Sequence, residues 1–269
     1  MLKTFYFGDS RRQLFGAYHS AQGAPAEEAV LLCNAGLEDY NASHWAYRKL
    51  AAQLAAAGRS VLRFDYSGSG DSAGGTAEAT PETWLADLHT AARELLDQSG
   101  LRALSVVGRG VGATLAAQAC ADGLAVRQLV LWEPVVRGAD HLAALARLHK
   151  HRLRMLLHDA EPGAEAELLG YAFTPAARRG IAALDLRASL ERTAVPTSIF
   201  LRERTRACDE LLAALPQLSL EIVDLDPPAH DDPDAALLPA NLLAAIAKRL
   251  AAPAPPQSLG AQTPARGAR

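Results

Sequence analysis

The chain has 269 residues, of which 49% are hydrophobic, so it is long enough to bury a large core as one α/β domain or as a domain with an inserted cap. Its net charge of −3 gives no general case for a nucleic-acid or anionic-membrane partner. No run of about 18 apolar residues predicts a membrane-spanning helix, and the first residues lack the pattern of a signal peptide.

The predicted elements begin with a pair of strands and then alternate between strands and helices. Two short runs, Thr4–Phe7 and Gln13–His19, predict an antiparallel pair at a sheet edge. The next elements are predicted at Ala29–Cys33 (strand), Ser43–Ala57 (helix), Val61–Tyr66 (strand), Pro81–Gln98 (helix, with Thr80 as its N-cap), Leu104–Val107 (strand), Val111–Ala121 (helix) and Leu129–Trp132 (strand). This alternation indicates right-handed βαβ units around a mostly parallel sheet.

The alternation breaks at residues 138–190, which are predicted to be helical with no strand among them. Strands resume at Pro196–Leu201 and Leu220–Leu225, and a last helical region is predicted at Ala235–Leu250, with Pro239 resetting its start. The expected organisation is therefore a core of residues 1–137 and 191–251 with a helical cap between its two parts. Residues 252–269 are rich in Pro, Ala, Gly and Gln, which predicts a disordered tail.

A glycine-rich turn lies between the predicted strand and helix at residues 105–114, which read Ser-Val-Val-Gly-Arg-Gly-Val-Gly-Ala-Thr. A nucleophile elbow has the pattern Gly-x-Ser-x-Gly, in which the glycines permit a tight turn. Gly108 and Gly112 fit this pattern, but Gly110 stands where the nucleophile would be and carries no oxygen. Nucleotide binding is a weaker alternative, because the spacing lacks the final glycine of the dinucleotide fingerprint. A natural glycine and an engineered inactivation both remain open.

The other parts of a hydrolytic site have candidates elsewhere in the chain. The backbone N–H of Val111 would form one arm of an oxyanion hole, and Leu37, in the loop after the first parallel strand, would form the other. His230 follows the last strand, where the histidine falls in the nucleophile–acid–histidine order; a surface histidine is the alternative. The orienting acid is expected after Pro196–Leu201, with Glu203 nearest. Asp209 and Glu133 are the other acid candidates.

Four further residues are predicted to contact a substrate: Gly36, Glu38, His44 and Arg109. His44 is the most interesting of them, because a histidine near the oxyanion hole could move protons without a serine. The alternative for His44 is a polar residue near a helix N-terminus. A substitute nucleophile at Cys33 is disfavoured, because Cys33 lies inside a strand.

The predicted cap carries basic residues at helical spacing: Arg147, His151, Arg154 and His158. This stripe could attract an acidic partner such as an acyl carrier protein, and a solvated basic face is the alternative. The three cysteines are widely spaced and predict neither a disulfide framework nor a metal site. No cofactor is expected, and a cytoplasmic location follows as the default.

Several motifs in order along residues 1–250 resemble the α/β-hydrolase superfamily. Residues 65–72, Asp-Tyr-Ser-Gly-Ser-Gly-Asp-Ser, look like its recurrent structural turn Asp-x-x-Gly-x-Gly-x-Ser. Segments 31–34, 61–65, 131–136 and 169–175 are similar to the exosortase-A-associated hydrolases and related proteins of bacterial biosynthetic clusters. The resemblance implies an α/β-hydrolase fold, esterase or thioesterase ancestry, and a group that often lacks the elbow serine.

Two functions are compatible with this pattern. The first is an enzyme that acts on an acyl or carbonyl substrate, by ester or thioester hydrolysis or by serine-free proton transfer, with His230 as base. The second is a non-catalytic protein that binds a small acyl compound or a carrier protein. The superfamily also includes serine-less isomerases, epimerases and binders, so the fold by itself leaves the activity open.

Overall fold

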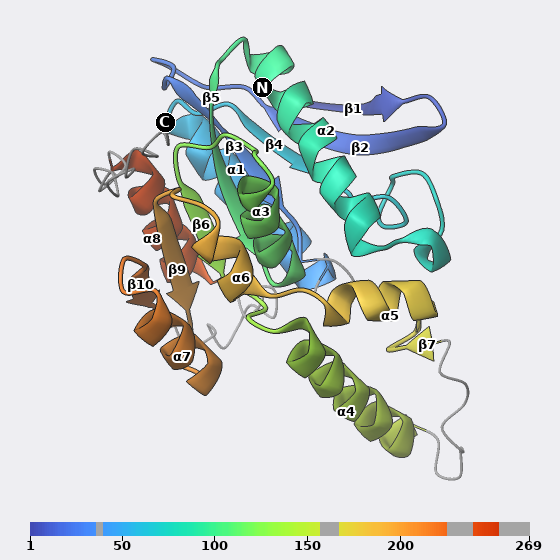
Figure 1. The fold of residues 1–269 in the computed structure, drawn as a ribbon. Coiled ribbons are helices and arrows are strands. Elements are labelled where there is room, and N and C mark those ends of the chain that lie inside the picture. Colours follow the sequence, from blue (N-terminus) through green and yellow to red (C-terminus); the bar gives the residue numbers. More distant parts are fainter. Residues whose placement is uncertain (36–39, 157–166, 225–238, 253–269) are drawn as a thin grey trace, which may run out of the picture.

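The computed structural model describes residues 1–35, 40–156, 167–224 and 239–252 (Figure 1). Its centre is an eight-stranded sheet in the order β1-β2-β4-β3-β5-β6-β9-β10. The strands are β1 (Leu2–Asp9), β2 (Arg12–His19), β3 (Glu28–Cys33), β4 (Val61–Phe64), β5 (Ala103–Arg109), β6 (Leu129–Trp132), β9 (Thr197–Leu201) and β10 (Ser219–Ile222). β2 pairs antiparallel with both β1 and β4, and all other neighbours are parallel. The predicted mostly parallel sheet and its antiparallel edge pair are confirmed.

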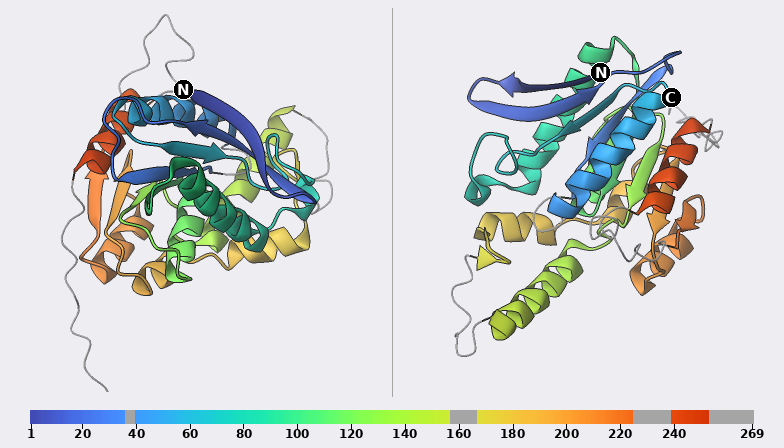
Figure 2. Two further views of the ribbon diagram at one scale, coloured as in Figure 1. Left: turned by 90° about the horizontal axis from the view of Figure 1, so that it is seen from above. Right: turned by 180° about the vertical axis from the view of Figure 1, so that it is seen from behind.

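Helices cover both faces of this sheet (Figure 2). One face carries α1 (Tyr40–Ala56) and α8 (Ala240–Ala251); the other carries α2 (Pro81–Ser99), α3 (Val111–Ala121) and α6 (Leu186–Glu191). Alternate residues of β3 serve the two cores: Val30 and Leu32 pack in the cluster of α1 and α8, whereas Leu31 and Cys33 pack in that of α2 and α3. This double burial explains why the parallel strands read as continuous apolar runs.

Local signals placed the start of α2 correctly, whereas α1 begins at Tyr40, three residues before the predicted Ser43. The Thr80 side chain accepts a hydrogen bond from the Thr83 N–H, and Pro81 occupies the first position of α2. The bounds of α3 and β6 are those predicted. α8 begins at Ala240, directly after Pro239, while the earlier part of the predicted last helical region lies outside the described residues. The predicted tail lies outside them too, apart from its first residue, Ala252.

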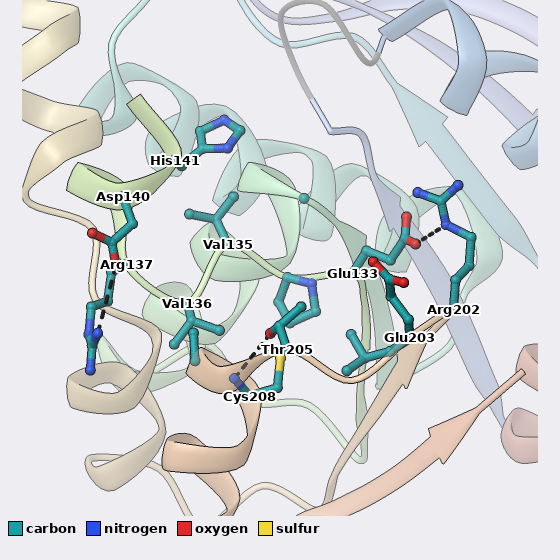
Figure 3. Close-up of a pocket in the computed structure, with 14 residues that line it drawn as sticks. Glu133, Val135, Val136, Arg137, Asp140, His141, Arg202, Glu203, Thr205 and Cys208 are labelled. Carbon is teal, nitrogen blue, oxygen red and sulfur yellow. Dashed lines mark hydrogen bonds and ion pairs between the residues drawn. The ribbon is translucent and has the colours of Figure 1, made fainter. Parts of the chain in front are cut away.

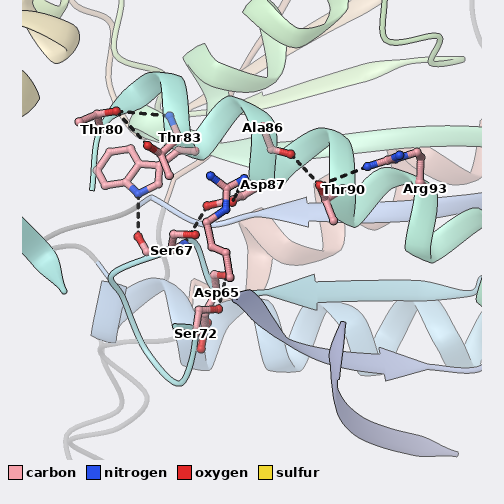
Figure 4. A network of polar contacts seen from close by, with 11 residues as sticks. Asp65, Ser67, Ser72, Thr80, Thr83, Ala86, Asp87, Thr90 and Arg93 are labelled. Atoms are coloured by element: carbon pink, nitrogen blue, oxygen red, sulfur yellow. Dashed lines mark hydrogen bonds and ion pairs between the residues drawn. The ribbon is translucent and has the colours of Figure 1, made fainter. Parts of the chain in front are cut away.

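The turn at residues 65–72 is held by its own side chains and by α2 (Figure 4). The Ser72 hydroxyl donates to the Asp65 carbonyl at 2.6 Å, and the Ser67 N–H donates to the Asp87 carboxylate at 2.8 Å. The Trp84 indole N–H donates to the Ser67 carbonyl at 3.1 Å. This arrangement agrees with the structural role that the sequence motif implies.

The segment predicted as an all-helical cap contains two short strands. β7 (Glu167–Leu168) pairs antiparallel with β8 (Tyr171–Ala172), between α4 (Gly138–Leu156) and α5 (Pro175–Ala182). The prediction of no strand in this segment was wrong, because two-residue strands are too short to show a periodicity. Their turn depends on Leu169 and Gly170, which have φ angles of 56° and 90°. Sequence reasoning also missed α7 (Arg206–Ala214), a short amphipathic helix.

The two ends of this excursion meet at the core. The Gly138 N–H donates to the Leu184 carbonyl at 2.8 Å, and the Leu186 N–H donates to the Val136 carbonyl at 3.0 Å. From this junction α4 extends away from the sheet (Figure 1). The junction lies near the carboxyl end of β6, so the first turn of α4 is held close to the turn after β5. None of the described helices is both long and apolar enough to cross a membrane.

Candidate functional site

The turn between β5 and α3 requires both of its flanking glycines. A Cβ atom on Gly112 would lie 1.9 Å from the Asn34 carbonyl oxygen, and one on Gly108 would lie 2.5 Å from the Ala113 Cα. Neither backbone atom can move without shifting the sheet or the helix. The chain therefore passes from strand to helix at a closeness that only glycine allows, which is the geometry of a nucleophile elbow.

Gly110 lies at the apex of this turn. Its φ of 55° and ψ of −124° form a conformation that residues with side chains rarely adopt. Its N–H donates to the Trp132 carbonyl at 3.1 Å, and its carbonyl accepts from the Val135 N–H at 3.2 Å. A Cβ atom at this position would have the Ala35 Cβ as its nearest neighbour at 3.4 Å. The apex therefore has room for a small side chain but carries none.

The predicted oxyanion hole lies partly within the described residues. No side chain caps α3 at Gly110, so the N–H groups of its first turn, including that of Val111, stand at the positive end of the helix dipole. The entry to the second loop is ordered by Asn34, whose Oδ1 accepts from the Ala35 N–H at 2.7 Å and from the Ser43 hydroxyl. Leu37 itself, with Gly36 and Glu38, lies outside the described residues, as does His230.

A cavity of about 710 Å³ opens beside Gly110, at the carboxyl ends of β6 and β9. Its walls come from the segment after β6, from the first turn of α4 and from the connection between β9 and α7 (Figure 3). In open α/β sheets, ligands bind at the carboxyl ends of the strands. The cavity is therefore the candidate functional site.

Three carboxylates line the cavity: Glu133, Asp140 and Glu203. Asp140 Oδ2 lies 3.7 Å from Arg137 Nη1. Glu133 accepts a hydrogen bond from Arg202 Nε, and the Glu203 carboxylate lies beside this pair (Figure 3). Glu203 is exposed and forms no ion pair with the other described residues. The third acid candidate, Asp209, accepts from Arg204 Nε at 2.8 Å and does not line the cavity. The described geometry thus leaves Glu203 as the carboxylate available to a further partner.

Glu133 has an unusual backbone. Its φ of 44° lies in the left-handed region, which residues other than glycine, Asn and Asp seldom adopt. Its N–H donates to the Phe200 carbonyl at 2.9 Å, which continues the pairing of β6 with β9. Strained residues of this kind concentrate at functional sites. Glu133 thus combines a left-handed backbone with a place in the cavity wall.

Two predicted substrate-binding residues do not line this cavity. The Arg109 guanidinium lies over the Trp132 ring, 4.7 Å from its centroid, with 11% of the side chain exposed. Arg109 Nη2 is 3.9 Å from a Glu133 carboxylate oxygen, so Arg109 supports the cavity wall from behind. His44 is half-buried, and burial, followed by the nearby Arg63 cation, lowers its pKa.

Sequence reasoning missed the residues that α4 contributes to the cavity. Asp140 and His141 come from its first turn, and Arg137 precedes it. Arg137 Nη2 donates to the Glu210 carboxylate at 2.6 Å, which ties the start of α4 to α7. No sequence pattern marks these residues, because their place follows from the contacts of residues 136–138 with residues 184–186. Their position just after β6 was the one available signal.

The cysteines are all free and buried. Burial raises the pKa of Cys120 to about 12, and it raises that of Cys33 further. A thiol that holds its proton so firmly is a poor nucleophile, which agrees with the interpretation of Cys33 as a core residue. No group of metal-binding side chains occurs among the described residues.

A family model described as serine aminopeptidase, S33, matches residues 25–221, and the chain belongs to this α/β-hydrolase family. No curated protein matches the sequence. Among solved structures, Est1E from Butyrivibrio proteoclasticus is similar with a TM-score of 0.64 and 14% identity, covering 93% of this chain and 99% of that one.

Two further solved structures show the same likeness. The thioesterase domain from the curacin biosynthetic pathway gives a TM-score of 0.60 at 17% identity, covering 94% of this chain and 100% of that one. The Pyrococcus furiosus esterase PF2001 gives 0.59 at 17% identity, covering 83% and 81%. At 17% identity these likenesses show the fold, which is the α/β-hydrolase fold of the matching family.

Proposed function

We propose that this chain acts on an acyl or carbonyl compound bound in the elbow cavity, and that it does so without an acyl-enzyme at position 110. The observation that carries the proposal is the combination at Gly110. The strained apex, the uncapped start of α3 and a cavity of about 710 Å³ are all present, but the apex has no side chain. Gly110 stands where a serine would give the elbow its nucleophile.

The proposed roles follow from this arrangement. The N–H groups of Val111 and Leu37 bind the carbonyl oxygen, and His230 takes a proton from the attacking water, with Glu203 as its orienting acid. In hydrolysis, water adds its oxygen to the carbonyl carbon, the bond to the leaving oxygen or sulfur breaks, and that atom takes up the proton. Gly36, Glu38 and His44 are assigned to substrate contact. Arg109 is assigned to the support of Glu133 in the cavity wall.

A second candidate is a non-catalytic protein that binds an acyl ligand or an acyl carrier protein. The lack of a side chain at Gly110 favours this non-catalytic candidate, because the elbow then has no nucleophile. The exposed basic residues of α4, Arg147, His151 and Arg154, supply a surface for an acidic carrier.

The test is to place a serine at the apex. We expect Gly110→Ser to react with a fluorophosphonate probe and to hydrolyse aryl esters or acyl thioesters, and Gly110→Ser combined with His230→Ala to lose both activities. Gly75→Ser is the matched control, because a Cβ atom at Gly75 meets no atom within 4 Å and the new serine lies outside the cavity.

Assays of the parent chain distinguish the enzyme from the non-catalytic binding protein. Hydrolysis by the parent that disappears in His230→Ala supports serine-free catalysis. No turnover in any variant, with measurable binding of an acyl ligand, supports the binding protein. Failure of Gly110→Ser to react with the probe, in a folded protein, contradicts the proposed site.

A further inference from the structure

The outer edge of β1 carries unpaired backbone groups. Among the strands that the structure describes, β1 ends the order of the sheet and pairs only with β2 (Figure 1). In an antiparallel pair, residues bonded to the partner alternate with residues whose N–H and C=O point away from it. The Ser20 N–H donates to the Met1 carbonyl at 3.0 Å, so the odd-numbered residues of β1 bond to β2. The backbone groups of Thr4 and Tyr6 therefore point outward from the sheet.

Apolar side chains accompany this open edge. Leu2 is 49% exposed and Tyr6 is 56% exposed, and the Tyr6 ring packs edge-on against Phe15 with centroids 5.6 Å apart. Proteins usually protect such an edge with charges, prolines or a covering element. Here one lysine, Lys3, and one aspartate, Asp9, stand near the two ends of the strand.

The sequence of β1 complements itself in one antiparallel register. If two copies pair along this edge with matching outward groups, the two-fold axis can pass through Thr4, Phe5, Tyr6 or Phe7. The axis at Thr4 sets Lys3 of each copy opposite the apolar Phe5 of the other. The axis at Tyr6 places Lys3 of each copy opposite Asp9 of the other. The axis at Phe5 sets Lys3 opposite the apolar Phe7, and the axis at Phe7 sets it opposite the like-charged Arg11. Charge complementarity selects the register centred on Tyr6.

The same register also aligns the aromatic residues. Phe5 of each copy lies opposite Phe7 of the other on one face, and the two Tyr6 rings meet on the other face beside Phe15. Aromatic cross-strand pairs and opposite charges each stabilise an antiparallel pair by about 0.2–1 kcal/mol. Gly8, with a φ of 89°, limits the regular ladder to its centre.

We infer that β1 is a homodimerisation edge, at which a second copy of this chain continues the sheet through an antiparallel β1–β1 pair centred on Tyr6. A single strand pair is smaller than a standard interface of about 1,600 Å². The dimer is therefore weak, with a Kd on the order of 10 µM.

Sedimentation velocity of the full chain across a concentration series tests this inference. The expected result is a monomer–dimer equilibrium that Tyr6→Pro abolishes, because proline removes the outward N–H without breaking a bond to β2. Tyr6→Val keeps the N–H and should retain dimerisation at reduced affinity. A parent chain that stays monomeric well above the expected Kd, or a Tyr6→Pro variant that still dimerises, overturns the inference.

Charge reversal tests the register. Lys3→Asp and Asp9→Lys should each raise the Kd by about tenfold, since each reversal places like charges together twice in the dimer. The double variant should restore the parent Kd, and Lys49→Glu, an exposed reversal on α1, should leave it unchanged. If the double variant is no better than the single ones, the Tyr6-centred register is wrong. Melting temperatures of all variants show that each remains folded.

Discussion

Two glycine-bearing turns lie at the carboxyl edge of the sheet, and they use their backbones in opposite ways. The β4–α2 turn directs its polar groups inward: the Ser72 hydroxyl donates to the Asp65 carbonyl, the Asp71 N–H donates to the Asp65 carboxylate, and the Ser67 N–H donates to the Asp87 carboxylate (Figure 4). The β5–α3 turn leaves its apex, Gly110, at the wall of a cavity. The first turn is bonded to its own residues and to α2, which stabilises the fold. At the second turn, the uncapped N–H groups at the start of α3 remain for a ligand.

The largest expected effect is at the elbow. Gly112→Ala should lower the free energy of unfolding by about 3 kcal/mol or more, because its Cβ would collide with the Asn34 carbonyl oxygen at 1.9 Å. Urea unfolding followed by circular dichroism measures the change. Gly75→Ala is the control and should stay within about 0.5 kcal/mol of the parent. An unaltered urea midpoint in Gly112→Ala would show that the turn can move away from the Asn34 carbonyl oxygen at little cost.

The second largest effect is expected for a substitution that removes a hydrogen bond of the β4–α2 turn. Asp87→Ala should cost about 2–3 kcal/mol, because it leaves the buried Ser67 N–H without its acceptor and removes the partner of Arg12 at 3.3 Å. The change is measured by the same urea titration. Asp97→Ala, on the same helix but more exposed, is the control and should have little effect. Equal midpoints for the two variants would contradict the role given to Asp87.

The pH dependence of the unfolding free energy gives a second test of the role of Asp87. Burial raises the pKa of Asp87 above 3.8, more than its hydrogen bonds and Arg12 lower it. The folded protein therefore binds this proton more tightly than the unfolded chain, so the Asp87 contribution to stability declines as pH rises from 3.8 through the raised pKa. Asp87→Asn should lack this decline. The difference in unfolding free energy between parent and Asp87→Asn, measured at a series of pH values, should move in favour of Asn as pH rises; movement in the opposite direction refutes the assignment.

A smaller effect is expected at the apex. Gly110→Ala should cost about 1–2 kcal/mol, since a side chain at φ of 55° is strained although the space is free. Thermal unfolding checks this value. A cost as large as that of Gly112→Ala would mean that the apex has no room for a side chain, which would count against an ancestral serine there.

The smallest effect concerns the start of α2. Thr80→Ala should cost about 1 kcal/mol, because the Thr83 N–H loses its capping oxygen. Thr80→Ser should recover most of this stability, as measured by thermal unfolding. If Thr80→Ala and Thr80→Ser have the same melting temperature, the side-chain cap at Thr80 does not stabilise the start of α2.

Sequence reasoning succeeded where the signal was local. The apolar run of Leu129–Trp132 and the glycines around Val111–Ala121 set the bounds of β6 and α3, because burial on both faces and a tight turn leave few alternatives. It failed at β7 and β8, which are too short for periodicity. It also failed to place His141 in the cavity, because that contact depends on residues 136–138 meeting residues 184–186.

The alternation of strands and helices as far as β6, the mostly parallel sheet and the glycine at the apex of the elbow were all predictable from the sequence, since these follow from apolar periodicity and from the steric limits of a tight turn. Which side chains surround that apex depends on tertiary packing. Glu133, Glu203 and the first turn of α4 meet there because parallel strands end at one edge and because residues 136–138 bond to residues 184–186. Such contacts join residues far apart in the chain, and only packing brings them together.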